Sequence, residues 1–227
     1  MKFADIIPYT RCAGYKVNVD LRYLPDHYLH YVQDYGLDVN PDFQRGNVWT
    51  VTQKARFVEH ALRGGQSGRD IYLNCPEWND LVETRSCVLV DGKQRLDAVL
   101  GFLDNEFPVF SGAYFRDFTD RLSLTGFTFN WHVNDLQTRE EVLQWYLDLN
   151  SGGTVHTDDE LTRVRGLLER KVPYVRPDAT VLASEARLDR ACIQEAVKHR
   201  AEQDAERAAN AAKFSTEAKT TRGRKRR

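Results

Sequence analysis

The sequence of 227 residues predicts a mixed fold of strands and helices, of the α/β or α+β class. Residues 127–133 alternate apolar and polar side chains, which indicates a half-buried strand. Residues 52–62 place apolar side chains at helical spacing and end before Gly64 and Gly65, which indicates an amphipathic helix. Apolar residues make up 41% of the chain, enough for a core. The length suits one domain with an appendage rather than two full domains.

The same two periods predict the other elements along the chain. Two capping boxes, Thr138 with Glu141 and Thr157 with Glu160, mark helix starts late in the sequence. They place residues 150–154 in a loop between two helices. The further expected strands are 15–24, 71–73 and 86–90, and the further expected helices are 28–36, 93–103, 138–149 and 157–170.

The cysteines and the apolar runs indicate a cytoplasmic protein. Cys12, Cys75, Cys87 and Cys192 are widely spaced and form no Cys-x-x-Cys pair, which predicts reduced thiols and argues against a zinc site or a disulfide framework. No apolar run approaches the length of a membrane span. The first residues lack the apolar centre of a signal peptide. We therefore expect no membrane partner.

Charge is divided unevenly along the chain, although the net charge is −1. Residues 1–180 carry a net −6, whereas residues 181–227 carry 12 Lys and Arg against 7 Asp and Glu. We expect a linker and amphipathic helix over 173–212 and a disordered basic tail over 213–227. The tail either binds nucleic-acid phosphates or only solubilises the protein. Its candidate nucleic-acid-binding residues are Arg222, Arg224, Lys225, Arg226 and Arg227.

The segment with the most chemical information is 88–100, where a buried strand meets a helix. The strand ends at Asp91-Gly92, and the helix begins at Lys93. A helix N-terminus offers unbonded N–H groups and a positive dipole end to a phosphate. Gly92 permits close backbone approach, and Lys93 and Arg95 add positive charge. The alternative is an ordinary solvated strand-to-helix turn.

Two further segments accompany this turn. Residues 41–50 read PDFQRGNVWT, and residues 149–154 read LNSGGT. In this order, together with Asp91-Gly92-Lys93-Gln94-Arg95, the three segments resemble the motifs of the DUF262 family of the ParB/sulfiredoxin-like superfamily. The usual central motif is Asp-Gly-Gln-Gln-Arg, so Lys93 departs from it and adds charge. The resemblance implies an α+β domain over 1–172, with a small mixed sheet and surrounding helices.

The resemblance also implies a function and a site. Larger proteins of this family, including the N-terminal domains of GmrSD-type restriction proteins, bind and hydrolyse nucleoside triphosphates with Mg²⁺. The setting would be phage–host conflict or DNA-modification sensing in a bacterial cell or a phage, with nucleotide, DNA, a separate nuclease or a host protein as partners. The implied catalytic residues are Asp91, Gln94 and Arg95, with Asp91 also a metal ligand. The implied nucleotide-binding residues are Gln44, Arg45, Gly92, Lys93, Asn150, Gly152 and Gly153.

Several of these residues also have a structural interpretation. Asp91 can cap the following helix, Arg45 can stack on Trp49, and Asn150 can end a helix. Asp97 lies one turn after Lys93, and we expect a surface pair between them.

Two other functions compete with hydrolysis. One is a ParB-like DNA-binding adaptor that uses the basic tail, and the other is a non-enzymatic regulator that binds a partner protein through its Ala-rich helix. The sequence contains no HNH nuclease pattern, so we expect no nuclease activity from this chain. It also contains no P-loop motif, which argues against a P-loop enzyme.

Overall fold

The computed structural model describes residues 15–76, 78, 86–119, 126–150, 158–178 and 181–182. These residues lie within Met1–Leu188, one of the two compact units into which the chain divides. The expected C-terminal helix after residue 182 and the basic tail with its five candidate nucleic-acid-binding residues fall outside the described part. Within the described part, no helix combines the length and apolarity that a membrane crossing requires.

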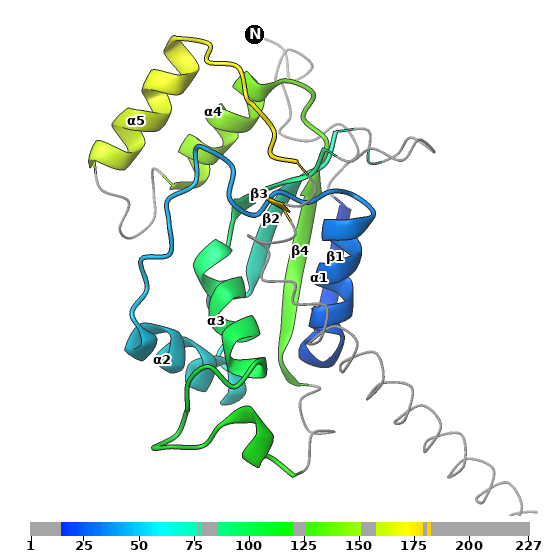
Figure 1. Cartoon of the computed structure of the whole chain (residues 1–227), viewed down its shortest axis with the longest axis vertical. Coiled ribbons are helices and arrows are strands. Elements are labelled where there is room, and N and C mark those ends of the chain that lie inside the picture. The colour runs from blue at the N-terminus through cyan, green and yellow to red at the C-terminus, as the bar shows by residue number, and fades with distance from the viewer. Residues whose placement is uncertain are drawn as a thin grey trace, which may run out of the picture. The chain divides into compact units, whose positions relative to one another are not determined.

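A four-stranded mixed sheet forms the centre of the domain (Figure 1). Its strands, in spatial order, are β1 (Tyr15–Asp20), β4 (Thr128–Asn134), β2 (Asp70–Asn74) and β3 (Val88–Asp91). β4 runs antiparallel to β1 and parallel to β2, and β2 runs antiparallel to β3. The α+β class is therefore confirmed, while the specific ParB/sulfiredoxin-like topology stays a prediction.

The described helices match the expected ones to within a few residues. Thr138 and Glu141 form the predicted capping box, in which the Glu141 amide donates to Thr138 Oγ1 at 3.3 Å. The second predicted box involves Thr157, which lies outside the described residues. The helices are α1 (Leu24–Gln33), α2 (Val51–Leu62), α3 (Lys93–Leu103), α4 (Arg139–Asn150) and α5 (Asp158–Glu169), with 3-10 turns at Leu21–Tyr23 and Phe115–Asp117.

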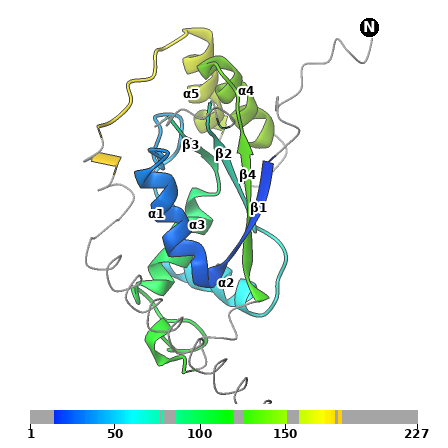
Figure 2. The same ribbon diagram turned by 90° about the vertical axis from the view of Figure 1, so that its right-hand side faces the viewer.

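The two faces of the sheet carry different cores. Alternation along β4 turns Phe129, Trp131 and Val133 toward one face, where α1, α2 and α3 contribute to the larger core. α4 and α5 lie together at one end of the sheet (Figure 2). On the opposite face they enclose a smaller core with Val90 and Phe43. The rest of that second face carries polar side chains from β1, β2 and β4.

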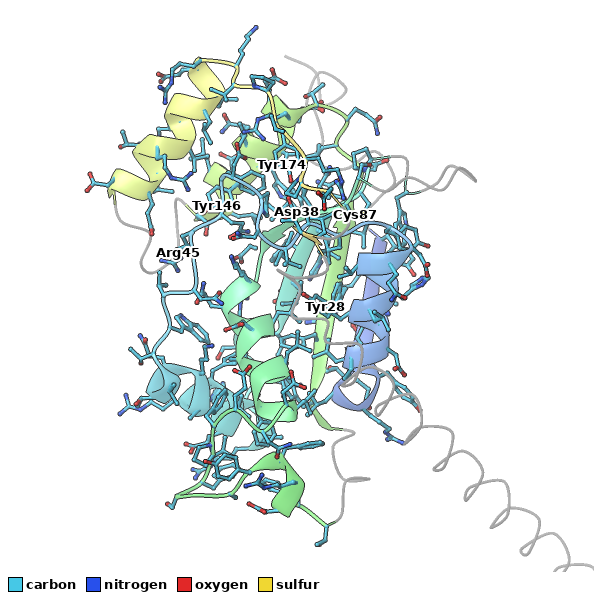
Figure 3. All side chains as sticks on the ribbon, viewed as in Figure 1. Tyr28, Asp38, Arg45, Cys87, Tyr146 and Tyr174 are labelled. Carbon is cyan, nitrogen blue, oxygen red and sulfur yellow. A yellow bond between two sulfur atoms is a disulfide. The ribbon has the colours of Figure 1, made fainter. Side chains whose placement is uncertain are left out.

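Cys75 and Cys87 form a disulfide, so the expectation of reduced thiols is wrong for this pair. The two residues follow β2 and precede β3, and their Cα atoms are 4.2 Å apart. Antiparallel pairing of the two strands brings these ends together, and a sequence separation of 12 does not reveal such pairing. Figure 3 shows Cys87 beside the sheet. Cys12 and Cys192 lie outside the described residues.

The first part of the expected linker packs against the domain. Residues 172–178 form no helix or strand, as expected. However, the Tyr174 hydroxyl donates to the Asp38 carboxylate (Figure 3), and the Arg176 guanidinium donates to the Gly36 carbonyl. The segment after α5 therefore returns to the loop that leads into the first motif.

Candidate functional site

Gln44 joins the first motif to the strand of the second. Its Nε2 donates to the carbonyl oxygens of Leu89 at 3.0 Å and Val90 at 2.7 Å. β3 is an edge strand, so this side chain occupies acceptors that another strand would otherwise use. From the other side, Arg163 of α5 donates to the Phe43 carbonyl at 2.9 Å. The first motif is thus held between β3 and α5.

Gln94 makes the reciprocal connection from the second motif to the first. Its Nε2 donates to the Gly46 carbonyl at 2.9 Å, and its Oε1 accepts from the amides of Val48 at 3.1 Å and Trp49 at 3.2 Å. Only 7% of the residue is exposed. The amide oxygen and one N–H are therefore committed to backbone. A water-orienting role for Gln94 stays a prediction, and the observed contacts are structural.

Asp91 and Arg95 form an ion pair where β3 passes into α3. Arg95 donates through one terminal nitrogen to Asp91 Oδ2, across one helical turn. Their side chains are 33% and 18% exposed, respectively, so solvent reaches both. Gly92 occupies the N-cap position of α3, and no side chain caps it. Asp91 therefore orients Arg95 rather than capping the helix.

Gly92 is required by the backbone and by its neighbour on β2. Its φ of 109° lies in the left-handed region that favours glycine. A Cβ at this position would lie 2.5 Å from Ile71 Cδ1 and 3.3 Å from Ile71 Cα. Packing of the turn on β2 thus explains the glycine without a ligand.

Arg45 reaches the same region from the first motif. Its guanidinium pairs with Glu160 of α5 at 3.5 Å, whereas the structural interpretation had named Trp49 as its partner. Tyr146 of α4 lies nearby (Figure 3) and interacts electrostatically with both Arg45 and Asp91. Burial is the main cause that raises the pKa of Tyr146 to about 12. Charges from the first two motifs therefore surround one buried phenol.

The expected surface pair between Lys93 and Asp97 is wrong. Lys93 contacts the side chain of Asn40. Asp97 is only 9% exposed and pairs with Lys54 of α2 at 2.5 Å. α2 packs along α3, so the Asp97 carboxylate faces a neighbouring helix that spacing along α3 alone cannot reveal.

The third motif is described only at its beginning. Asn150 ends α4, as expected, and its Nδ2 donates to the Tyr146 carbonyl at 2.7 Å. The side chain is buried and turned back onto its own helix, which agrees with the helix-end interpretation. Gly152 and Gly153 lie outside the described residues, so their contact with a ligand stays a prediction.

Sequence reasoning missed a row of polar side chains across the sheet. In the strand register, Tyr72 on β2 lies opposite Asp91 on β3 and opposite His132 on β4. His132 in turn lies opposite Lys16 on β1. Lys16, His132 and Tyr72 are directly opposed and share a face. Asp91 joins them across an irregularity in the register of β2 with β3, and its charge acts on Tyr72. We call these four residues the polar row. Burial, Asp70 and Asp91 raise the pKa of Tyr72. The alternation over residues 127–133 placed His132 on the polar face of its strand, but the residues beside it on neighbouring strands depend on strand register.

The polar groups present suit a magnesium ion that arrives with a nucleotide. Among the described residues, no group of three or more His, Cys, Asp or Glu could hold a metal by itself. Asp91 offers a half-exposed carboxylate beside Arg95. Mg²⁺ commonly takes one or two protein carboxylates and completes its shell with phosphates and water. Asp91 would be the protein ligand of such an ion.

Comparisons of this chain with protein-family models, with curated proteins and with solved structures found no match.

Proposed function

We propose that this chain binds a nucleoside triphosphate at Asp91 and Arg95 and hydrolyses its terminal phosphoanhydride with Mg²⁺. The observation that carries the proposal is the reciprocal bonding of Gln44 and Gln94, which joins the first two motifs. This connection gathers charged groups from both motifs at the N-terminus of α3. A role in phage–host conflict or DNA-modification sensing follows from the resemblance and forms part of the same proposal.

Arg95 has the geometry of a phosphate ligand. A guanidinium carries five N–H donors, and the contacts described for Arg95 use one terminal nitrogen for Asp91. Asp91 fixes the orientation of the remaining donors, which reduces the entropy lost when a phosphate binds. Backbone N–H groups at the start of α3 add to the positive potential. Arg45, held by Glu160, supplies a second cation.

These groups would act mainly by electrostatic stabilisation. Phosphoryl transfer spreads negative charge over the oxygens of the transferred group, and fixed cations offset that charge. When bound, Mg²⁺ supplies further neutralisation of the phosphates. Tyr146 and its apolar neighbours limit the access of water on one side of Arg45 and Asp91. A smaller amount of water strengthens the charge–charge interactions there.

The test is Mg²⁺-dependent phosphate release from each of the four ribonucleoside triphosphates. We expect the wild-type chain to release phosphate and Arg95→Ala to lose at least about 100-fold in kcat, since one charge-stabilising donor contributes about that much. Arg116→Ala is the matched control, because Arg116 is exposed and stacks on Tyr114 away from the site. Melting temperatures of both variants establish that they are folded.

Two outcomes contradict the proposal. If the wild-type chain showed no phosphate release and no nucleotide-induced rise in Tm, nucleotide chemistry at this site would be ruled out. An equal loss in Arg95→Ala and Arg116→Ala would show that the effect is not specific to the site.

A further inference from the structure

One part of the sheet carries polar side chains on a face that no described helix covers. We call it the open face: Lys16, Asn18, Asp70, Tyr72, Asn130 and His132. In the register, Asn130 lies between Asn18 and Asp70. These three residues form a second row on the same face, two residues along each strand from the polar row. All six are exposed or half-buried. α4 reaches only its border, where Trp145 meets Tyr72 edge-on. A half-open polar sheet face beside Asp91 is a surface on which a ligand can lie.

His132 and Asp70 form an ordered pair on the open face. His132 Nε2 lies 2.7 Å from Asp70 Oδ1, and Asn130 Nδ2 donates to the same oxygen at 3.1 Å. Partial burial raises the pKa of Asp70, but the hydrogen bonds from His132 and Asn130 outweigh it, so the pKa lies below its ordinary value. Asp70 is therefore an anion at neutral pH and accepts a proton-bearing Nε2.

This arrangement selects one tautomer of the neutral imidazole. With hydrogen on Nε2, the lone pair lies on Nδ1, which has no hydrogen-bond partner among the residues that the structure describes. The ring is held further by stacking on Tyr72, with centroids 4.6 Å apart and planes inclined by 15°. A histidine oriented by a carboxylate, with its other nitrogen unbonded, is prepared to accept a proton.

Tyr72 connects this pair to the Asp91–Arg95 pair. Asp91 and His132 flank Tyr72 in the register, on the two strands beside β2. Neighbouring strands lie about 4.8 Å apart, which places the Cα atoms of Asp91 and His132 about 10 Å from each other. A phosphate bound by Arg95, followed by a water molecule in line with it, can span such a distance above the Tyr72 ring.

We propose that His132 is the general base of the hydrolysis and that Asp70 is its positioning residue. This inference rests on the proposed function. A lone pair of water attacks the terminal phosphorus, and the new O–P bond forms as the bond to the bridging oxygen breaks. The bridging electron pair leaves with the nucleoside diphosphate. One water proton moves to His132 Nδ1, and the other stays on the released phosphate.

The pH dependence of kcat is the distinguishing measurement. Protonated imidazole cannot accept the water proton, so we expect wild-type kcat to fall on the acid side. The groups around His132 are Lys16 on β1, Asp70 and Tyr72 on β2, Asp91 on β3 and Arg95 in the first turn of α3. We expect His132→Gln to lose at least about 100-fold in kcat together with this acid limb, since glutamine can bond Asp70 but cannot act as a base.

Controls separate a chemical role from a structural one. His60→Gln is the matched control, because His60 bonds Ser67 in an exposed position on another part of the surface. KM and the nucleotide-induced rise in Tm should remain near wild-type values in His132→Gln. Free imidazole should restore part of the rate of His132→Ala, and Asp70→Asn should lower kcat less than His132→Gln does.

The outcomes distinguish this inference from the proposed function. If the wild-type chain releases phosphate and His132→Gln keeps kcat within about twofold, or keeps the acid limb, His132 is not the base and the proposed function stands. If the wild-type chain binds nucleotide but releases no phosphate, both hydrolysis and the general base are refuted.

Discussion

Replacing Gln94 with leucine tests whether the two motifs are held together by side-chain amides. The change removes the hydrogen bond that Gln94 donates to Gly46 and the two that it accepts from Val48 and Trp49, without a large change in volume. Each such bond contributes about 0.5–1.5 kcal/mol net, and buried backbone groups left without partners cost more. Three bonds give about 3 kcal/mol. The apolar surface of leucine offsets part of this, so we expect a loss of about 2–3 kcal/mol.

Urea unfolding followed by tryptophan fluorescence measures the loss directly. A decrease of this size lowers Tm by about 4–12 °C in a chain of this length. Gln144→Leu is the matched control, because Gln144 lies exposed on α4 and bonds Asp148 on its own helix. It should change the free energy of unfolding by less than about 0.5 kcal/mol. A Gln94→Leu variant as stable as Gln144→Leu would refute the structural role assigned to Gln94.

Two further predictions concern a turn and a buried imidazole. Gly92→Ala should lower the unfolding free energy by about 2–4 kcal/mol in urea, because it adds a clash to positive-φ strain. Gly112→Ala, at φ 131° in open space, should show the strain alone and be milder. Burial, and then His30, lower the pKa of His27 to about 4, so the unfolded chain binds the proton first. The free energy of unfolding should therefore fall as the pH is lowered from 6.5 toward 4. The fall should be smaller in His27→Phe. Tm measured against pH for both chains tests this, and equal slopes would contradict it.

Local patterns were sufficient to predict most elements. α3 begins at Lys93 and ends at Leu103, as expected, because a glycine turn precedes it and its apolar residues recur at helical spacing. The strand expected at 127–133 is β4, one residue later. The capping box at Thr138 is present. These features depend on interactions within a few residues, which a sequence displays directly.

The features that the sequence did not reveal join segments far apart in the chain. The Cys75–Cys87 disulfide depends on antiparallel pairing of β2 with β3. The pairing of Asp97 with a lysine on α2 depends on helix packing. The pairing of Asp70 with His132 depends on the parallel register of β2 with β4, across 62 residues. A shift of one residue would turn either side chain to the other face. Periodicity identifies such residues as polar-facing but cannot name their partners.

The geometry divides the motif residues into two groups that activity measurements alone would not separate. Gln44, Gln94 and Gly92 hold backbone segments in place, whereas Asp91 and Arg95 keep side-chain atoms accessible to a ligand. Loss of any of these residues is expected to reduce activity, the first group by unfolding or displacing the site and the second by removing charge. Activity per folded molecule distinguishes them. A Gln94 variant that loses both stability and rate in proportion acts through structure, while an Arg95 variant that stays folded and loses rate acts through chemistry.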